Sequence, residues 1–127
     1  MREVVLDASV VLKWFHTEGE ENVEAARRVR GEFENGRLQV LAPPLLWLEI
    51  INVAARRWRW EPTRLTRMST VLPDLGFVLA EPALAGVVRW AGKGLTAYDA
   101  VHVAVAETAQ IELITDDFEI QRVAPDL

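Results

Sequence analysis

Hydrophobic and polar residues along this chain form segments that predict strands and helices in alternation. Short, continuous apolar segments predict strands at residues 2–8, 38–42, 77–80 and 112–115. Continuous apolar segments of this length are typical of strands buried on both faces of a parallel sheet. The intervening segments predict helices at residues 9–15, 20–36, 43–61, 62–76, 82–94, 96–110 and 116–122. This alternation predicts an α/β fold, a three-layer α/β/α sandwich with a mainly parallel central sheet.

The segment at residues 43–61 predicts a long helix with one polar face. Its flanks are so apolar that we expect the helix to be buried nearly all round. Leu45, Glu49, Asn52 and Arg56 nevertheless recur at a spacing that places them on one face. We therefore expect that face to direct Glu49 and Asn52 toward water, charge or metal.

Composition narrows the class of protein. The 127 residues fit one domain spanning the whole chain, and the absence of cysteine excludes disulfides, thiolate nucleophiles and cysteine-ligated zinc. No apolar run is long enough to span a bilayer or to resemble a signal peptide, so we expect a cytoplasmic protein without a membrane partner. The net charge of −5 argues against a general nucleic-acid binder. An arginine-rich stretch at residues 56–67 is the exception.

Acidic residues follow the ends of two predicted strands. Asp7 ends the first strand, and Asp116 and Asp117 directly follow the last. Asp99 lies in the first turn of the predicted helix 96–110. Because ligands of such sheets bind beyond the carboxyl ends of the strands, we expect these acids to converge there, together with Glu49.

Each acid also has a structural explanation. Asp99 follows Thr96 at the spacing of a capping box, and Asp116 or Asp117 suits the cap of a final helical turn. Asp7 suits a turn in which it accepts backbone hydrogen bonds. A glutamate in the middle of a buried helix, Glu49, is the hardest to explain in this way.

As a group the carboxylates favour a metal site. Close together and uncompensated, they would repel and raise one another's pKa values. One or two Mg²⁺ or Mn²⁺ ions, which prefer carboxylate and water oxygens, would remove that conflict. Such ions can activate water for phosphodiester hydrolysis without a protein nucleophile. The ligand hypothesis therefore comprises Asp7, Glu49, Asp99 and one residue of the Asp116–Asp117 pair.

Several neighbouring residues have two readings each. Ser9 and Thr115 suit either hydrogen bonds to the carboxylates or helix capping, and His102 suits either orientation of a carboxylate or a satisfied, partly buried histidine. We expect His16 to lie at the surface.

The arginine-rich stretch also has two readings. Arg56, Arg57 and Arg59 suit RNA phosphates, with Trp58 and Trp60 as stacking surfaces, or else a solvated helix end over packed tryptophans. Trp14 and Trp90 suit core or interface positions.

Four segments in order, VVLDASVVL, PPLLWLEIINV, LTAYDAVHVAVA and LITDDF, give the chain a resemblance to the PIN-domain ribonucleases, in particular the VapC toxins of VapBC toxin-antitoxin pairs. The resemblance covers essentially the whole chain. It implies an α/β/α fold, Mg²⁺- or Mn²⁺-dependent endoribonuclease activity on RNA, homodimerisation, and inhibition by a cognate antitoxin protein.

The resemblance also implies roles for single residues. Asp7, Glu49, Asp99 and Asp117 match the four family acids, with Asp116 as the alternate to Asp117. Ser9, Asn52 and Thr115 match the supporting polar residues of the family.

Other functions remain open at this point. A receiver domain would carry its acid pair after the first strand, and an aspartate-nucleophile phosphatase would carry D-x-D there, where Ser9 holds the second position. A catalytically silent PIN-like interaction module is the non-enzymatic alternative.

Overall fold

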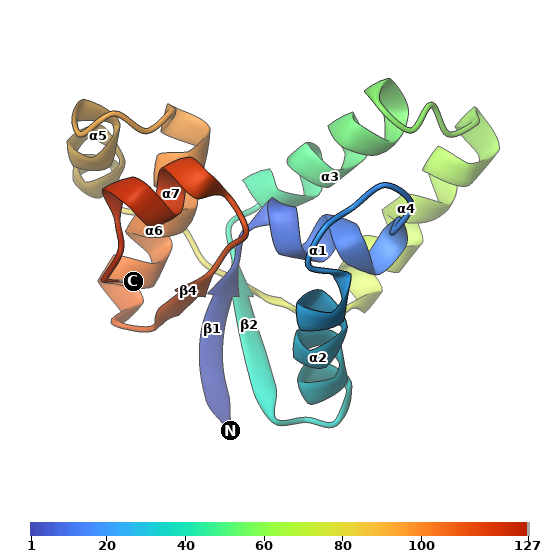
Figure 1. Cartoon of the computed structure of the whole chain (residues 1–127), viewed down its shortest axis with the longest axis horizontal. Helices are drawn as coiled ribbons and strands as arrows, with labels where there is room; N and C mark the ends of the chain where they lie inside the picture. The colour runs from blue at the N-terminus through green and yellow to red at the C-terminus, as the bar shows by residue number, and fades with distance from the viewer. Residues whose placement is uncertain (127) are drawn as a thin grey trace.

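The computed structural model describes residues 1–126, and it confirms the predicted alternation of elements (Figure 1). The strands are β1 (Arg2–Leu6), β2 (Leu38–Ala42), β3 (Val78–Leu79) and β4 (Glu112–Ile114). The helices are α1 (Ala8–Phe15), α2 (Val23–Glu34), α3 (Leu45–Arg56), α4 (Pro62–Asp74), α5 (Leu84–Gly92), α6 (Ala97–Ala109) and α7 (Phe118–Val123).

The four strands form one parallel sheet in the order β3-β2-β1-β4. In this sheet Leu6 of β1 is paired with Ile114 of β4, so the carboxyl ends of these two strands are neighbours. The backbone N–H of Asp7 continues this contact by donating to the carbonyl oxygen of Ile114 at 3.1 Å. The residues after β1 and β4 therefore begin side by side.

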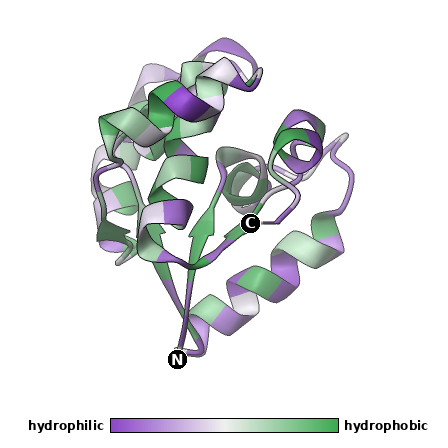
Figure 2. Cartoon of the chain, turned by 90° about the vertical axis from the view of Figure 1, so that its left-hand side faces the viewer, coloured by the Kyte–Doolittle hydropathy of each residue, from purple (hydrophilic) through white to green (hydrophobic). Residues whose placement is uncertain are grey.

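Helices cover both faces of the sheet, which gives the predicted three layers. Alternate side chains of β1 point to opposite faces, as the period of a strand requires. Val4 and Leu6 pack in a core with α1, α2, α3 and α4, whereas Val5 packs with α5, α6 and α7. Figure 2 shows the mainly hydrophobic strands surrounded by helices that carry both hydrophilic and hydrophobic residues.

The structure corrects the predicted end of α3. The helix ends at Arg56, and not at residue 61. The N–H groups of Arg57 and Trp58 both donate to the carbonyl oxygen of Val53, and Arg59 then adopts a left-handed conformation with φ of 56°. That conformation cannot continue a right-handed helix.

The expected burial of α3 is also wrong. Leu46, Ile50 and Ala54 face the core, but Leu48 and Ile51 on the same helix are 62% and 37% exposed. The helix therefore lies at the surface of this chain.

The predicted strand at residues 77–80 is reduced to Val78–Leu79 at the sheet edge. Phe77 instead packs among aromatic rings, with its centroid 5.1 Å from that of Phe33 and 5.4 Å from that of Trp47. The other predicted elements lie within a few residues of their predicted ends. No helix described within residues 1–126 is long and apolar enough to cross a membrane.

Candidate active site

Asp7 is a buried carboxylate at the end of β1. Its residue is 4% exposed, and three donors from two segments bind its Oδ2. The hydroxyl of Ser9 donates at 2.8 Å, the hydroxyl of Thr115 at 2.9 Å and the backbone N–H of Ser9 at 3.4 Å. These bonds explain how an isolated carboxylate is tolerated here, because buried charges require hydrogen bonds or a counter-charge. The N-cap of α1 is Asp7, which accepts from the N–H of Ser9, so the helix-capping reading of Ser9 is wrong. The hydroxyl of Ser9 instead donates to the carboxylate of Asp7, as its supporting reading expects.

The turn between β4 and α7 is attached to Asp7 through the same hydroxyls. Ser9 Oγ accepts a hydrogen bond from the N–H of Asp116 at 2.9 Å, and Thr115 Oγ1 accepts one from the N–H of Asp117 at 2.9 Å. The carboxylate of Asp117 caps α7 by accepting from the N–H of Ile120 at 3.0 Å. The two neighbouring strand ends thus form one hydrogen-bonded unit.

Asp116 and Asp117 have different surroundings although they are adjacent in sequence. The carboxylate of Asp116 forms an ion pair with Lys13 and accepts from Asn22 Nδ2 at 2.7 Å. The carboxylate of Asp117 lies close enough to Asp99 for its charge to raise the pKa of Asp99. Of this pair, Asp117 is therefore the residue whose charge raises the pKa of Asp99, while Asp116 is paired with a cation.

Glu49 projects from α3 toward a buried histidine on α6. Glu49 Oε1 lies 2.5 Å from Nε2 of His102, and His102 is 0% exposed. The same nitrogen is 3.9 Å from Asp7 Oδ1. Of the two readings of His102, the structure supports the one in which it orients a carboxylate, and it is fully rather than partly buried.

The charges around His102 determine its pKa. Burial by itself lowers the pKa, but the hydrogen bond to Glu49 and the negative charges of Glu49, Asp7 and Asp99 outweigh that effect, so the pKa is raised. The other ring nitrogen, Nδ1, has no hydrogen-bond partner among residues 1–126. Glu49 is therefore the single strong partner of this histidine.

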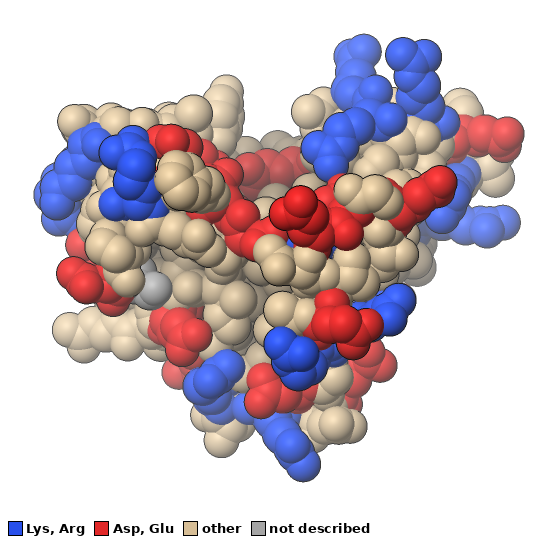
Figure 3. Space-filling model, viewed as in Figure 1, with Lys and Arg blue, Asp and Glu red and all other residues tan. Residues whose placement is uncertain are grey.

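Asp99 lies close enough to the other three acids for their charges to affect its pKa. Its backbone N–H donates to Thr96 Oγ1 at 3.1 Å, which confirms Thr96 as the cap of α6. Its pKa is raised by burial and then by the charges of Asp117, Asp7 and Glu49, with an opposing hydrogen bond from Thr96. The fold thus brings together carboxylates from β1, α3, α6 and the turn after β4, and Figure 3 shows acidic side chains gathered in the hollow between α3 and α7.

The donor chemistry of this site fits a divalent cation. Carboxylate oxygens together with neighbouring hydroxyls are the environment that Mg²⁺ and Mn²⁺ prefer. Within the described residues 1–126, however, no group of three or more His, Asp or Glu side chains is close enough to hold a metal as it stands. This spacing is expected of repelling carboxylates, one of which is engaged by His102.

The residues after α3 combine packed tryptophans with exposed arginines. Trp58 stacks on His16 with ring centroids 4.7 Å apart, and the guanidinium of Arg64 lies 3.6 Å from the ring centroid of Trp60. The tryptophan rings are therefore engaged within the chain, and His16 is half-buried rather than at the surface as we expected. Arg57 pairs with Glu20 at 3.0 Å, whereas Arg56, Arg59 and Arg67 have no ion-pair partner in residues 1–126.

Two residues beside the site, Lys13 and Asn22, were not predicted. The available signal for Lys13 was a lysine inside the apolar helical segment SVVLKWF, where a charge needs a partner. Asn22 carried no comparable signal, because its role depends on a contact with Asp116, 94 positions away. Trp90 is buried and Trp14 packs against the core, as expected.

Comparison with known proteins agrees with the class that the fold and the acidic hollow define, an α/β protein with acidic residues beyond the carboxyl ends of its parallel strands. The sequence matches the PIN domain family over residues 4–125, and the chain belongs to that family. PIN domains are generally nucleases, which supports a nuclease function. No curated protein matches the sequence significantly.

Among solved structures, the crystal structure of PAE2754 from Pyrobaculum aerophilum is similar to this chain. The TM-score is 0.65 at 27% sequence identity, over 96% of this chain and 86% of that one. None of the comparisons favours the receiver-like or phosphatase-like alternatives.

Proposed function

We propose that this protein is a metal-dependent endoribonuclease that hydrolyses RNA phosphodiester bonds. The observation that carries the proposal is the environment of Asp99, whose pKa is raised by burial and by the charges of Asp117, Asp7 and Glu49. Four acids from separate elements would not be brought together in this way for stability, because their repulsion opposes folding. Clustered groups with perturbed pKa values are typical of functional sites.

In this proposal Asp7, Glu49, Asp99 and Asp117 are the catalytic, metal-binding residues and hold one or two Mg²⁺ or Mn²⁺ ions. When bound, such an ion lowers the pKa of a water molecule and neutralises charge on the phosphate. Ser9 and Thr115 orient the carboxylate of Asp7, and His102 orients that of Glu49. The support for Asp117 over Asp116 is that Asp116 is already paired with Lys13 and Asn22.

Residues on the exposed face of α3 would meet the substrate. Glu49 and Asn52 line the same open groove, together with Leu48 and Tyr98. Asn52 is exposed and suits a hydrogen bond to RNA or to water at the site.

Arginines at the end of α3 and directly after it would contact RNA phosphates outside the acidic hollow. Figure 3 shows Lys and Arg side chains gathered over the connection between α3 and α4. Arg56 and Arg59 suit this role best because they are exposed and unpaired within residues 1–126, whereas Arg57 must first leave Glu20. The rings of Trp58 and Trp60 pack against each other, so the proposal does not assign them base stacking.

The toxin role and the partners are a further part of the proposal. They rest on the resemblance to VapC toxins, which implies a cognate antitoxin protein and a homodimer. Exposed hydrophobic side chains on α3 and α5 support a partner surface: Leu48, Ile51, Leu84 and Val88 are between 37% and 76% exposed. Light scattering of the purified chain measures the dimer, and a monomer would contradict that part.

The activity is tested by incubating structured cellular RNA with the purified protein and Mn²⁺ or Mg²⁺. We expect cleavage that stops in EDTA and falls by at least about a hundredfold in Asp99→Asn, since the metal site loses one ligand. Asp126→Asn, which changes an exposed aspartate outside the site, is the matched control. Cleavage in EDTA, or undiminished cleavage by Asp99→Asn, would refute the mechanism, and metal binding without turnover would favour the silent interaction module.

A further inference from the structure

Lys13 is a buried cation next to the acidic site. It lies on α1, its side chain is 5% exposed, and it pairs with the carboxylate of Asp116. A lysine removed from water in this way needs a compensating charge. Asp116 supplies this charge. The pairing gives a role to Asp116, the one acid of the Asp116–Asp117 pair that the proposed metal site does not use.

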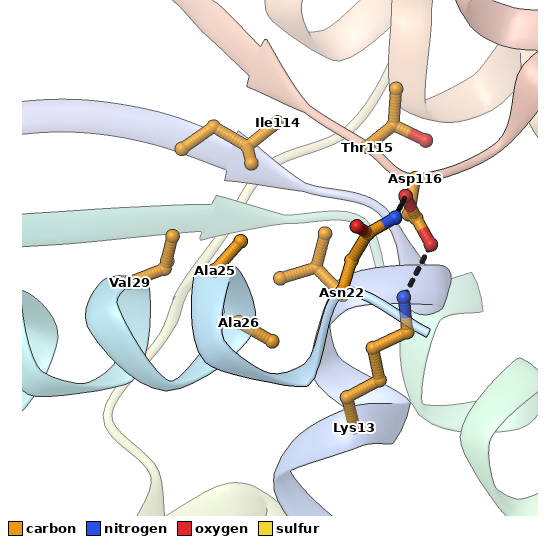
Figure 4. Close-up of a pocket in the computed structure, with 9 residues that line it drawn as sticks. Lys13, Asn22, Ala25, Ala26, Val29, Ile114, Thr115 and Asp116 are labelled. Carbon is orange, nitrogen blue, oxygen red and sulfur yellow. Dashed lines mark hydrogen bonds and ion pairs between the residues drawn. The ribbon is translucent and has the colours of Figure 1, made fainter. Parts of the chain in front are cut away.

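Asp116 is held from three directions. Besides Lys13, its carboxylate accepts a hydrogen bond from Asn22 Nδ2 at 2.7 Å, and its N–H donates to Ser9 Oγ at 2.9 Å. Figure 4 shows the side chains of Lys13 and Asn22 directed toward Asp116. Asn22 precedes α2 with a left-handed φ of 57° and forms no side-chain cap with that helix, so its amide serves Asp116 instead.

The ion pair borders a small cavity. A cavity of about 110 Å³ lies beside Lys13 and Asp116, lined on its apolar side by Val10, Ala26 and Val29. Side chains next to a cavity have room to rearrange, so packing alone does not fix this turn. The polar contacts of Asp116 hold the turn, together with the hydrogen bonds of Thr115 and Asp117.

The turn that Asp116 belongs to also carries two residues of the proposed site. Thr115 precedes it and donates to Asp7 at 2.9 Å. Asp117 follows it, and its charge raises the pKa of Asp99. A displaced Asp116 would shift both neighbours, because they share its backbone.

We propose that Lys13 is a positioning residue: it holds Asp116 outside the carboxylate group and thereby fixes the turn that carries Thr115 and Asp117. The effect of Lys13 on metal binding rests on the proposed metal-dependent function, whereas its effect on the geometry of the turn can be measured without metal.

An electrostatic role and a positioning role of Lys13 predict opposite changes in Mn²⁺ affinity when the lysine is replaced. If the lysine acted only through its charge, Lys13→Met would remove a neighbouring cation and tighten Mn²⁺ binding. If it positions the turn, the same change weakens Mn²⁺ binding, since residues that orient metal ligands typically contribute about 10–100-fold in affinity. The sign of the change therefore separates the two roles.

The test compares Lys13→Met with Lys93→Met in the intact purified chain. Lys93 is exposed, with its ammonium 4.5 Å from the ring centroid of Trp90, so its replacement makes the same change of charge away from the site. Calorimetry measures Mn²⁺ affinity, hydrogen exchange of the metal-free protein measures protection of the amides at residues 115–118, and RNA cleavage gives kcat and KM.

We expect Lys13→Met to bind Mn²⁺ about tenfold more weakly, to exchange the amides of Asp116 and Asp117 faster, and to lower kcat with little change in KM. Lys93→Met should match the wild type in all three. Tighter Mn²⁺ binding, or unchanged protection of the turn, would overturn the inference.

A second variant covers a failure of Lys13→Met to fold. Asp116→Asn keeps the shape of the side chain but removes the charge that faces Lys13, and it should also speed exchange in the turn relative to Asp126→Asn. If the wild type neither binds Mn²⁺ nor cuts RNA, the proposed function fails, while faster exchange in the Lys13 variant would still support positioning.

Discussion

Replacing Asp99 by asparagine should stabilise the metal-free fold. Burial and three neighbouring carboxylates raise the pKa of Asp99, and residues 1–126 offer its side chain no ion-pair partner. Its ionised form is therefore costly in the folded state. Asparagine has almost the same shape and carries no charge, so the substitution removes the repulsion while keeping the packing.

The expected gain is about 1 kcal/mol in the free energy of unfolding. Relief of unfavourable interactions at functional sites typically gives about 0.5–2 kcal/mol, and partial exposure of Asp99 screens the repulsion toward the lower part of that range. For a chain of 127 residues the gain corresponds to roughly 3–5 °C in Tm.

The gain should depend on pH in one direction. Because the pKa of Asp99 is raised in the fold, the penalty is present above that pKa and disappears as the pH falls toward the ordinary value of 3.8. The advantage of Asp99→Asn should therefore be complete at pH 8 and absent below pH 3.8.

Metal should reverse the order of the two proteins. A ligand at a hundred times its Kd stabilises the fold by about 2.7 kcal/mol, and Asp99→Asn loses most of this because it lacks one ligand. Urea unfolding of the wild type, Asp99→Asn and the control Asp126→Asn, in EDTA and in Mn²⁺, measures both effects. A variant less stable than the wild type in EDTA at pH 8 would refute the reasoning.

Two further predictions concern His102 and the arginines. His102→Leu should lower the free energy of unfolding by about 1.5–3 kcal/mol at pH 6, the value typical of a hydrogen bond to a charged group, whereas His102→Gln, which keeps a donor for Glu49, should lose less. Because the pKa of His102 is raised, the stabilisation from its pair with Glu49 is complete below the ordinary value of 6.5 and is lost as the pH rises through the folded pKa. Urea unfolding should therefore show a smaller difference in stability between the wild type and His102→Leu at pH 9 than at pH 6. A larger difference at pH 9 would contradict the pairing. In an Asp99→Asn background, which slows cleavage, and with EDTA present, Arg56→Ala and Arg59→Ala should each reduce the slope of log K against log salt for single-stranded RNA by about 0.7. The control Arg28→Ala, at an exposed position on α2, should leave the slope unchanged, and equal slopes for all three variants would exclude the phosphate contacts.

Much of the fold follows from the hydrophobic pattern. Strand β1 is apolar on both faces because Val4 and Val5 meet different helical layers, and this burial is what the continuous apolar run predicted. The end of α3 could not be predicted in the same way. It depends on Arg59 adopting a left-handed conformation while Trp58 stacks on His16, a contact across 42 positions of sequence.

The exposure of α3 shows a second limit of the pattern. Leu48 and Ile51 are as hydrophobic as core residues, yet they are exposed in this chain. Hydrophobicity indicates that a surface is better buried, but it does not say whether this chain or a partner covers it.

The approach of the residues after β1 and β4 was predictable because parallel neighbouring strands end at the same edge of the sheet. The difference between Asp116 and Asp117 was not, since adjacent residues in a turn point in directions set by their contacts. Lys13 and Asn22 draw the carboxylate of Asp116 away, and His102 binds Glu49 from a different helix. Such pairings between distant segments leave no periodic signal in a single sequence.

Calorimetric titration with Mn²⁺ tests most directly whether these four carboxylates share a cation. The wild type should bind one or two ions, Asp117→Asn should lose at least on the order of a hundredfold in affinity as a lost ligand, and Asp116→Asn should lose about tenfold as a lost positioning contact. A wild type that binds no Mn²⁺, or an Asp117→Asn variant that binds it as tightly as the wild type, would contradict the account.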